Sequence, residues 1–427
     1  MKLASLKSDS RDGTLMVVSG DLKSMHNASS ICPNLRHAIE NWGTSFPLLR
    51  ELAAELEDGV LQTEPYDPTR LSSPLPRSFQ WADGSAYLSH MRLVRKARGA
   101  EMPPNSEIEP LLYQGGSDYF LGPTDDIVCA DTNWGLDFES EIAIITDDIP
   151  MGCSVSEAPD HIKLVMLCND ISLRLIMKPE LAKGFGFYQS KPASAFSPVC
   201  VTPDELGGQW DTAKVNLPLK TTYNGETFGN VHAGTDLNFD FAHLIAHAAK
   251  TRELRAGTII GSGTVSNTNY EEVGSSCLAE RRMIETLEPG QPVTRFMEPG
   301  DTIHIDYDGE YGSERVLIVS GRATVVPDDG SPSFTVATGD AVYFMHGFRC
   351  TWRILETPLV QRYGYFGADG KELKDDTLTC DVCGADCSEE SYLYDEEMDI
   401  CPRCFQLDAK SAQQWEDAEY QRWGKSV

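Results

Sequence analysis

The chain has 427 residues, and its 36 Lys and Arg residues against 65 Asp and Glu residues give a formal net charge of −29. A chain of this length accommodates two or three domains, and an acidic field of this size repels phosphate backbones, which argues against nucleic acid as a partner. The sequence has no apolar run of about 18 residues and no apolar signal segment at its N-terminus, so we expect a cytoplasmic protein that does not contact a membrane.

The first part of the chain, residues 1–72, is predicted to form a small mixed domain. Residues 15–18 are a short apolar run typical of a strand. Residues 35–56 carry apolar side chains at roughly helical spacing, which Pro47 interrupts. Several prolines between residues 65 and 76 indicate a linker after this domain.

The next part, residues 73–311, alternates short β-branched runs with Gly and Pro turns. This alternation is typical of a mixed β-sheet. Helices are expected at residues 160–168 and 239–250, where the apolar residues recur at helical spacing. The predicted class is therefore α+β, with most of the structure in strands.

The remainder of the chain falls into two further segments. Residues 312–366 contain short strands separated by turn signals, a pattern that predicts a small antiparallel β-barrel. Residues 377–427 form an acidic tail in which five of the twelve cysteines gather. Each segment is expected to be a module of its own.

The most informative segment is the strand predicted over residues 136–145. Because side chains two residues apart on a strand share a face, Glu139 and Glu141 are expected to point to the same side. Two neighbouring carboxylates repel each other unless a positive charge lies between them, and Mg²⁺ and Ca²⁺ prefer carboxylate oxygens. The alternative interpretation of the pair is a solvated strand face.

Three other segments place polar groups at the ends of predicted elements. Asp170 follows an apolar run, Asp83 stands seven residues before His90, and residues 259–264 form a Gly-rich loop after a strand. The loop is not a Walker motif, because no Gly-Lys-Ser follows its glycines. Each segment by itself indicates little about chemistry.

The order and spacing of these segments resemble the fumarylacetoacetate hydrolase family over about residues 1–308. Residues 1–72 look like the N-terminal domain of bacterial members. The resemblance implies a mixed β-sheet roll of the family's type, an enzyme that is often a homodimer, and a site for Mg²⁺ or Ca²⁺. The metal ligands that it implies are Asp83, Glu139, Glu141 and Asp170.

The resemblance also implies the catalytic residues. His90 corresponds to the family's catalytic histidine, and Glu280 is the candidate for the glutamate that orients it. In such a pair the imidazole activates water and the carboxylate stabilises the imidazolium. A structural histidine is the alternative for His90. The resemblance further implies that the cationic Arg174 and Lys191 act in catalysis, by stabilising an oxyanion or gripping a substrate carboxylate. It implies Tyr113 and the loop residue Thr264 as substrate-binding residues.

Together these residues predict a metal-dependent hydrolase that cleaves a C–C bond in a β-diketo acid. The expected substrate is fumarylacetoacetate or a related acylpyruvate, as in tyrosine and other aromatic amino-acid catabolism. Residues 175–180 lack the Gln and Tyr that help grip the substrate in the family's animal enzymes. The alternatives are a keto-acid decarboxylase or isomerase on the same scaffold, and a non-catalytic binding or scaffold protein that acts through its C-terminal modules.

A second histidine pair, His243 and His247, lies four residues apart on a predicted helix and therefore shares a face. Ala and Leu surround the pair, and no Glu follows His243 as a zincin motif requires. We interpret both histidines as structural.

The segment of short strands after residue 312 resembles a short cupin. The resemblance depends on Glu314, Gly321 and the segments 339–344 and 350–352. Metal-binding cupins carry a His-x-His before the glutamate, which is absent here, so a metal-free cupin is expected. Its first strands are expected to be missing or shared with the preceding domain, through a natural fusion or a faulty gene model.

The cysteine-rich tail has the spacing of a zinc site. Two Cys-x₂-Cys pairs stand 17 residues apart, and four thiolates suit tetrahedral Zn²⁺. A structural site is expected, and the tail is a candidate surface for a protein partner. Cys387 is an alternative to Cys383; the predicted ligands are Cys380, Cys383, Cys401 and Cys404.

Overall fold

The computed structural model describes residues 1–97, 101–102, 105–287, 291–307, 313–327, 333–338, 341–345, 350–366, 372–373, 392–394 and 398–400. The chain divides into two compact units, residues 1–308 and residues 309–427. Within the described ranges no helix combines the length and hydrophobicity that a membrane crossing requires.

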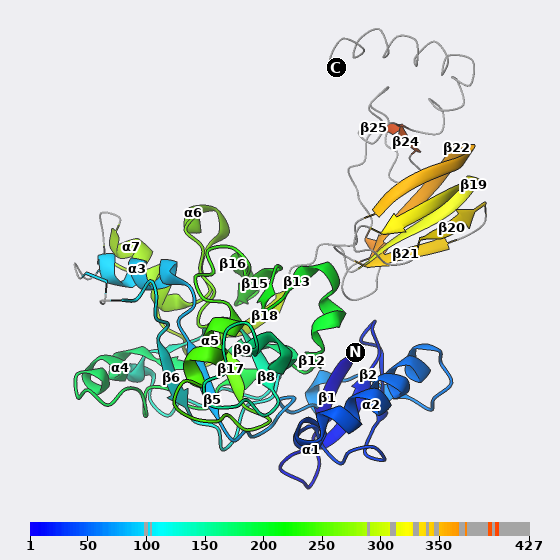
Figure 1. Cartoon of the computed structure of the whole chain (residues 1–427). Helices are drawn as coiled ribbons and strands as arrows, with labels where there is room; N and C mark the ends of the chain where they lie inside the picture. Colours follow the sequence, from blue (N-terminus) through cyan, green and yellow to red (C-terminus); the bar gives the residue numbers. More distant parts are fainter. Residues whose placement is uncertain are drawn as a thin grey trace. The chain divides into compact units, whose positions relative to one another are not determined.

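An eleven-stranded mixed sheet is the centre of the first unit (Figure 1). All its strand pairs are antiparallel except the pair β17–β5. In spatial order its strands are β4 (Glu64–Pro65), β3 (Ser24–Asn27), β2 (Thr14–Val18), β1 (Lys2–Leu6), β12 (Cys200–Val201), β9 (Ile162–Asn169), β8 (Ser140–Thr146), β17 (Ile259–Gly261), β5 (Trp81–Gly84) and β6 (Leu112–Gly115), with β11 (Ala195–Phe196) also paired to β9.

Smaller sheets and short helices surround this sheet. The small sheets are β7 (Leu136–Asp137) with β10 (Ser172–Leu173), β13 (Trp210–Asp211) with β14 (Lys214–Val215), and β16 (Glu226–His232) with β15 (Pro218–Tyr223) and β18 (Ile303–Tyr307). The helices are α1 (Leu35–Glu40), α2 (Trp42–Glu57), α3 (Leu88–Ala97), α4 (Arg174–Leu181), α5 (Phe241–Ala248), α6 (Tyr270–Val273) and α7 (Leu278–Leu287), with the 3₁₀ turns η1 (Pro68–Arg70), η2 (Thr132–Trp134), η3 (Ala158–His161) and η4 (Pro203–Gln209).

The central strands are buried on both faces. Along β8, Ile142 and Ile144 belong to the core that includes α5, whereas Ala143 and Ile145 belong to the core that includes α1 and α2. A strand covered on both faces has no solvent side, so its sequence reads as a continuous apolar run. The mostly β, mixed-sheet class that the sequence predicts is confirmed.

The prediction of a helix at residues 160–168 is wrong. The chain makes the short turn η3 and then the strand β9, in which Val165 faces Ile144 across the sheet. Six of the eight β9 residues are buried. A short apolar run that is buried on both faces has no clear period, and β-branched residues together with the neighbouring strand β8 then favour a strand.

The helical segment at residues 35–56 is also broken at a different point than expected. Asn41 ends α1 and begins α2, while Pro47 lies inside α2. Because Pro47 is near the start of α2, its missing N–H costs one hydrogen bond to the first turn. The strand at 15–18 and the helix at 239–250 are present as β2 and α5.

The N-terminal segment extends the central sheet, because β1 pairs with β12 through Lys2 opposite Val201.

The second unit contains a five-stranded antiparallel sheet. Its strands are β20 (Phe334–Ala337), β19 (Ser313–Pro327), β22 (Cys350–Phe366), β23 (Glu372–Leu373) and β21 (Ala341–Met345). A separate pair joins β24 (Tyr392–Tyr394) to β25 (Met398–Ile400). All the predicted zinc-binding cysteines lie outside the described residues, so the zinc site stays a prediction.

The double burial of β8 gives a test of the fold. We expect Ile144→Ala to lower the free energy of unfolding by about 2–5 kcal/mol, because it removes apolar contacts and leaves a cavity between two packed faces. Urea unfolding followed by circular dichroism measures this loss. Val60→Ala is the matched control, since Val60 is 70% exposed and should cost about 0.5 kcal/mol or less. Equal costs at the two positions would contradict the double-sided core.

Candidate metal centre and active site

Three buried carboxylates lie close together on or next to inner strands of the central sheet. Asp83 is on β5, Glu141 is on β8, and Asp170 directly follows β9. The strand β17 lies between β8 and β5, with Gly261 opposite both Ala143 and Asp83. This register brings oxygen atoms of the three acids within 4.8 Å of one another.

Glu141 is the one of these three carboxylates that has no compensating group among the described residues. Neither carboxylate oxygen of Glu141 has a hydrogen-bond partner among the described residues, although both are fully buried. Burial and the neighbouring Asp83 and Asp170 raise the pKa of Glu141 well above its ordinary range. Burial and Asp170 likewise raise the pKa of Asp83. A divalent cation with oxygen ligands fits this set, because it would supply the charge and the contacts that the buried oxygens lack.

The Gly-rich loop after β17 closes this group of acids. The Gly263 backbone N–H donates a hydrogen bond to Asp83 Oδ1 at 3.0 Å. Gly263 has a φ of +78°, and a Cβ there would lie 2.5 Å from the Gly84 carbonyl oxygen, so only glycine fits. Thr264 follows it, buried at 7% exposure, before Val265 donates its N–H to the Ser140 carbonyl.

Lys191 links the fourth predicted ligand to the other acids. Its ammonium Nζ lies 2.6 Å from Glu139 Oε2 and 2.5 Å from Asp170 Oδ2. Burial by itself would lower the pKa of Lys191, but the two carboxylates raise it, so the group is held as a cation. Tyr113 donates its hydroxyl to Asp170 Oδ2 at 2.7 Å. The lysine and tyrosine predicted to contact substrate therefore both touch a predicted metal ligand.

Glu139 sits apart from the other three acids. Arg174 donates from one guanidinium nitrogen to Glu139 Oε1 at 2.6 Å, and Lys191 occupies the other oxygen. Although burial would raise the pKa of Glu139, Arg174 and Lys191 hold it below its ordinary range. The structure groups Glu139 with His90 and Cys277 within 4.8 Å, and Asp83 with Glu141 and Asp170. Glu139 thus joins the acid cluster to the histidine side of the site.

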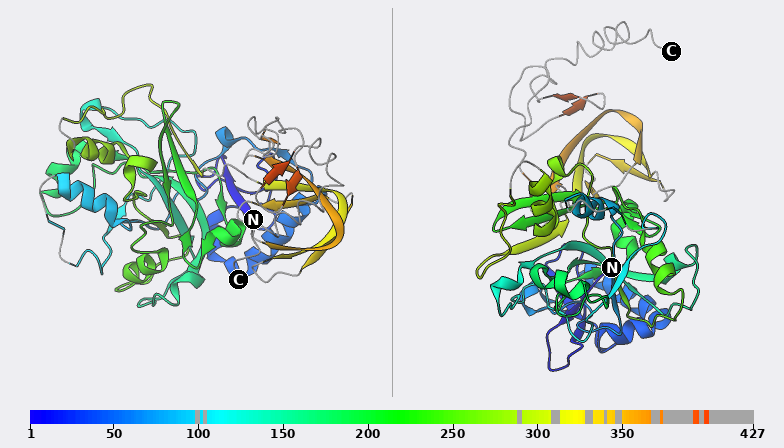
Figure 2. Two further views of the ribbon diagram at one scale, coloured as in Figure 1. Left: turned by 90° about the horizontal axis from the view of Figure 1, so that it is seen from above. Right: turned by 90° about the vertical axis from the view of Figure 1, so that its left-hand side faces the viewer.

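His90 and Glu280 form the second half of the site. His90 Nδ1 lies 2.6 Å from Glu280 Oε2, and Glu280 is fully buried. The pair comes from two neighbouring helices, α3 and α7, which lie side by side in the views of Figures 1 and 2. Because Glu280 holds Nδ1, the other ring nitrogen of His90 is left to meet a substrate or water.

Arg174 acts as an anchor inside the protein. Its Nε donates to Asp137 Oδ2 at 2.8 Å, and its side chain is 14% exposed. Asp137 also accepts the backbone N–H groups of Leu278 and Ala279 at 2.8 and 2.9 Å. These are the first N–H groups of α7, so Asp137 caps the helix that carries Glu280. The guanidinium of Arg174 therefore positions Asp137 and Glu139, and its predicted action on substrate stays a prediction.

Four further residues of the site were not predicted from the sequence: Asp137, Cys277, Ser194 and Phe187. Asp137 had a signal, because it continues the two-residue spacing of Glu139 and Glu141. The other three had none: Cys277 Sγ accepts the Glu280 N–H, Ser194 donates to Asp170 Oδ1 at 2.8 Å, and the Phe187 ring packs edge-on against Tyr113. The contacts of Ser194 and Phe187 join residues that are far apart in the sequence, whereas Cys277 is three residues from Glu280.

The pair His243 and His247 lies outside this site. His243 Nδ1 hydrogen bonds to Asp240 Oδ1 at 2.7 Å at the start of α5, and the side chain is 48% exposed. Among the described residues, neither histidine belongs to a group of potential metal ligands.

Comparisons with known proteins place this site in a family. Residues 80–325 match the family model for the fumarylacetoacetate hydrolase C-terminal domain, residues 1–77 match fumarylacetoacetase N-terminal domain 2, and residues 304–363 match the EutQ-like cupin domain. The chain belongs to the fumarylacetoacetate hydrolase family. Members of this family are enzymes, hydrolases or isomerases, and the predicted cupin resemblance is confirmed.

Individual relatives are distant. The chain is 26% identical to a fumarylacetoacetase of Caenorhabditis elegans over 221 residues, a match covering 45% of this chain and 53% of that protein, so it spans about half the worm protein's length. It is 24% identical to an uncharacterized protein of Archaeoglobus fulgidus, covering 52% of this chain and 82% of that one. A fumarylacetoacetate hydrolase structure from Exiguobacterium antarcticum aligns with a TM-score of 0.51 and 20% identity, covering 72% of this chain and 96% of that one. At this identity the structural likeness supports the fold.

The unpaired charge of Glu141 gives a pH-dependent prediction. A buried carboxyl group with a raised pKa makes its full contribution to the free energy of unfolding at pH values below its ordinary pKa of 4.5, where it is protonated. This contribution is lost as the pH rises through the raised pKa, because the folded protein must then bury a charged carboxylate. In protein kept in EDTA, Glu141→Gln should therefore be more stable than the parent at pH 8, by at least about 2 °C in Tm, which is about 1 kcal/mol for a domain of this size.

The measurement is thermal unfolding in EDTA between pH 4 and pH 8. The difference between Glu141→Gln and the parent protein should shrink toward pH 4. Glu226→Gln is the matched control, because Glu226 is exposed on β16. A parent protein that is as stable as Glu141→Gln at every pH would show that the buried carboxylate is compensated in another way.

Proposed function

We propose that this protein is a divalent-metal-dependent hydrolase that cleaves a C–C bond in a β-diketo acid, with fumarylacetoacetate or a related acylpyruvate as the substrate. The observation that carries the proposal is a group of three buried acids, Asp83, Glu141 and Asp170, in which Glu141 has no partner among the described residues. Glu139 lies between this group and the hydrogen-bonded pair of His90 and Glu280. Membership of the fumarylacetoacetate hydrolase family supports it.

The acids would hold the metal. Carboxylate oxygens select hard cations, so Mg²⁺ and Ca²⁺ suit Asp83, Glu141 and Asp170, with Glu139 next to them. When bound, such an ion acts as a Lewis acid on the two oxygens of a 1,3-diketone. Asp170 is held in place for this role by Ser194, Tyr113 and Lys191.

His90 would act as the general base. With Nδ1 held by Glu280, the other ring nitrogen accepts a proton from water as the water oxygen bonds to the substrate carbonyl carbon. The C–C bond then breaks, and its electron pair remains with the leaving carbon as an enolate. Glu280 stabilises the imidazolium that forms, because its carboxylate lies 2.6 Å from the ring nitrogen.

Lys191 would bind a substrate oxygen. A lysine ammonium has three N–H donors, and Glu139 and Asp170 use two of them. The third donor is left for a carboxylate or carbonyl oxygen of the substrate. The ring of Phe187, whose centroid is 5.9 Å from Lys191 Nζ, gives this position an apolar side.

Decarboxylation or isomerisation of a keto acid is the alternative on the same scaffold. Those reactions would use the same acids to hold a metal ion. They differ from hydrolysis because water does not attack a carbonyl carbon. The buried link between His90 and Glu280 favours hydrolysis, because a tautomer fixed in this way suits the activation of water.

The deciding experiment follows the ultraviolet absorbance of a panel of 2,4-diketo acids, including fumarylacetoacetate. We expect loss of the diketone band with Mg²⁺ and no loss with EDTA, because the acids need the ion to bind the diketone. Formation of the two carboxylic acid products, measured by chromatography, separates hydrolysis from isomerisation. A folded protein that turns over no member of the panel would contradict the proposal.

Substitution separates the two halves of the site. His90→Ala should reduce kcat by about 10²-fold or more, because it removes the base, while calorimetry shows that Mn²⁺ still binds. Asp170→Ala should abolish Mn²⁺ binding and turnover together. His161→Ala is the matched control, because His161 also bonds a carboxylate, Asp147, but lies at η3. Full activity of His90→Ala would refute the assigned base.

A further inference from the structure

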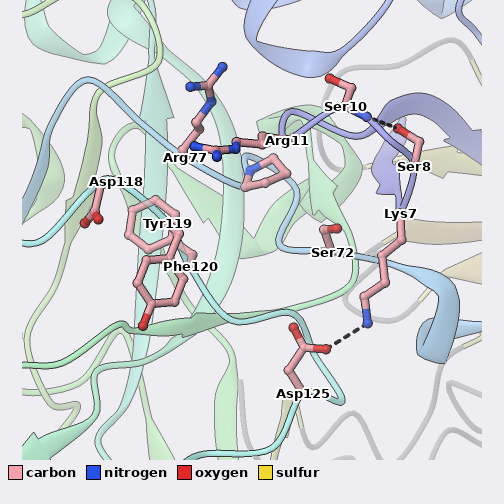
Figure 3. Close-up of a pocket in the computed structure, with 11 residues that line it drawn as sticks. Lys7, Ser8, Ser10, Arg11, Ser72, Arg77, Asp118, Tyr119, Phe120 and Asp125 are labelled. Carbon is pink, nitrogen blue, oxygen red and sulfur yellow. Dashed lines mark hydrogen bonds and ion pairs between the residues drawn. The ribbon is translucent and has the colours of Figure 1, made fainter.

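A cavity of about 490 Å³ lies away from the acids, and its lining comes from both segments of the first unit that match family models. Residues from the N-terminal segment 1–77 form one side, and residues 118–125 form the other. Figure 3 shows these side chains around the cavity. The lining residues are Lys7, Ser8, Ser10, Arg11, Ser72, Pro76, Arg77, Asp118, Tyr119, Phe120 and Asp125.

The cavity has fixed walls. Arg77 donates two hydrogen bonds to the buried carboxylate of Asp12, at 2.6 and 3.0 Å, and Arg36 approaches the same carboxylate at 3.3 Å. Across the cavity, a Cβ at Gly122 would lie 2.9 Å from the Leu71 carbonyl oxygen, so the two segments meet there at a distance that only glycine allows. The ion pair between Lys7 and Asp125, at 2.7 Å, joins the walls at another point.

Among the described residues, two charged groups that line the cavity have no ion pair or side-chain hydrogen bond: Arg11, and Asp118 on the opposite side (Figure 3). Lys7 pairs with Asp125 and Arg77 pairs with Asp12. Within the part of the chain that the structure describes, Arg11 has neither an ion pair nor a hydrogen bond from its guanidinium. Its side chain lies on the same side of the cavity as Arg77 (Figure 3). Guanidinium groups bind carboxylate and phosphate oxygens in a two-pronged geometry.

An aromatic wall lies next to these cations. Tyr119 is 58% exposed and lines the cavity, and Phe120, which is 6% exposed, is fixed by its edge-on contact with the Phe196 ring. An exposed tyrosine ring on a fixed wall offers a face for a planar apolar group. The hydroxyl groups of Ser8, Ser10 and Ser72 supply polar contacts at the cavity's edge.

We propose that this cavity is a binding site for a small organic oxyanion, in which a carboxylate or phosphate group binds Arg11 and Arg77 and a planar body packs on Tyr119. The volume of about 490 Å³ lies in the range of small-molecule sites. A site between two packed segments is a common location for such ligands. Nothing in the proposed hydrolysis uses these residues.

The walls of this cavity are bonded to the acid cluster. Leu121, which follows Phe120, donates its N–H to the Ser194 carbonyl at 3.0 Å and accepts the Phe196 N–H at 3.2 Å. Ser194 in turn donates its hydroxyl to Asp170 Oδ1 at 2.8 Å. An occupant that shifts residues 119–121 therefore acts on a predicted metal ligand through two hydrogen bonds. We infer that occupancy changes the affinity of the acid cluster for a divalent ion, a consequence that rests on the proposed function.

The binding site is tested by isothermal titration calorimetry on the full chain, with benzoate and phenyl phosphate as probes. We expect at least one probe to bind, and Arg11→Gln to weaken that binding about tenfold or more, because a hydrogen-bonded charge pair is lost. Binding of benzoate but not of phenyl phosphate would identify a carboxylate site. Binding of phenyl phosphate but not of benzoate would identify a phosphate site. Arg11 is exposed, so its replacement should leave the circular dichroism spectrum unchanged.

The matched control is Arg252→Gln. Arg252 is an exposed arginine outside the cavity, so its replacement should leave probe affinity unchanged. Tyr119→Ala should weaken phenyl phosphate binding and leave inorganic phosphate, which has no planar body, unaffected. No heat from either probe at about millimolar concentration, or equal affinity in the parent, Arg11→Gln and Arg252→Gln proteins, would overturn the site.

The coupling is tested by titrating Mn²⁺ with and without saturating probe. A change in Mn²⁺ affinity of about threefold or more, with the reciprocal change in probe affinity, is the expected result. Equal Mn²⁺ affinities would overturn the coupling while leaving the binding site in place. Absence of any Mn²⁺ binding, with the probe still bound, would instead refute the proposed metal centre.

Discussion

The structure depends on one electrostatic constraint, which is the burial of more carboxylates than cations on the inner strands of one sheet. In the part of the chain that the structure describes, the buried cations of the site are Lys191 and Arg174. They compensate Glu139, Asp137 and Asp170, whereas Glu141 has no partner. Buried charge that lacks a partner is costly. The buried acids therefore need positive charge, which either bound protons or a divalent cation would supply. This need connects the fold with the proposed metal-dependent chemistry.

The balance of buried charges also fixes the part of the site that contains His90 and Glu280. Asp137 neutralises Arg174 and also caps the helix α7 that carries Glu280. One carboxylate therefore sets both the position of the cation beside Glu139 and the start of the helix that orients His90. Through Arg174, Asp137 also contacts Glu139, so a chain of hydrogen bonds connects the two halves of the site although they come from distant parts of the chain.

Much of the fold followed from local sequence patterns. The apolar runs at β2 and β8 and the helical spacing at α5 predicted these elements, because each pattern reflects which faces are buried. The family resemblance implied four ligands of one metal, namely Asp83, Glu139, Glu141 and Asp170. The structure brings oxygen atoms of Asp83, Glu141 and Asp170 within 4.8 Å and groups Glu139 with His90 and Cys277. Residues 160–168 could not be assigned in this way, because burial on both faces removes the period that separates a strand from a helix.

The sequence by itself determined the residue types that the site requires and the family to which the chain belongs. Both can be read from the order and spacing of motifs along the chain, without knowledge of the folded structure. Only the tertiary structure decided how the charges are shared. It placed Lys191 between Glu139 and Asp170, turned Arg174 inward to Asp137, and joined Leu121 to Ser194 next to a cavity. These pairs are separated by up to about 70 residues, and no local pattern encodes a contact between two segments whose distance depends on how the whole sheet is registered and packed.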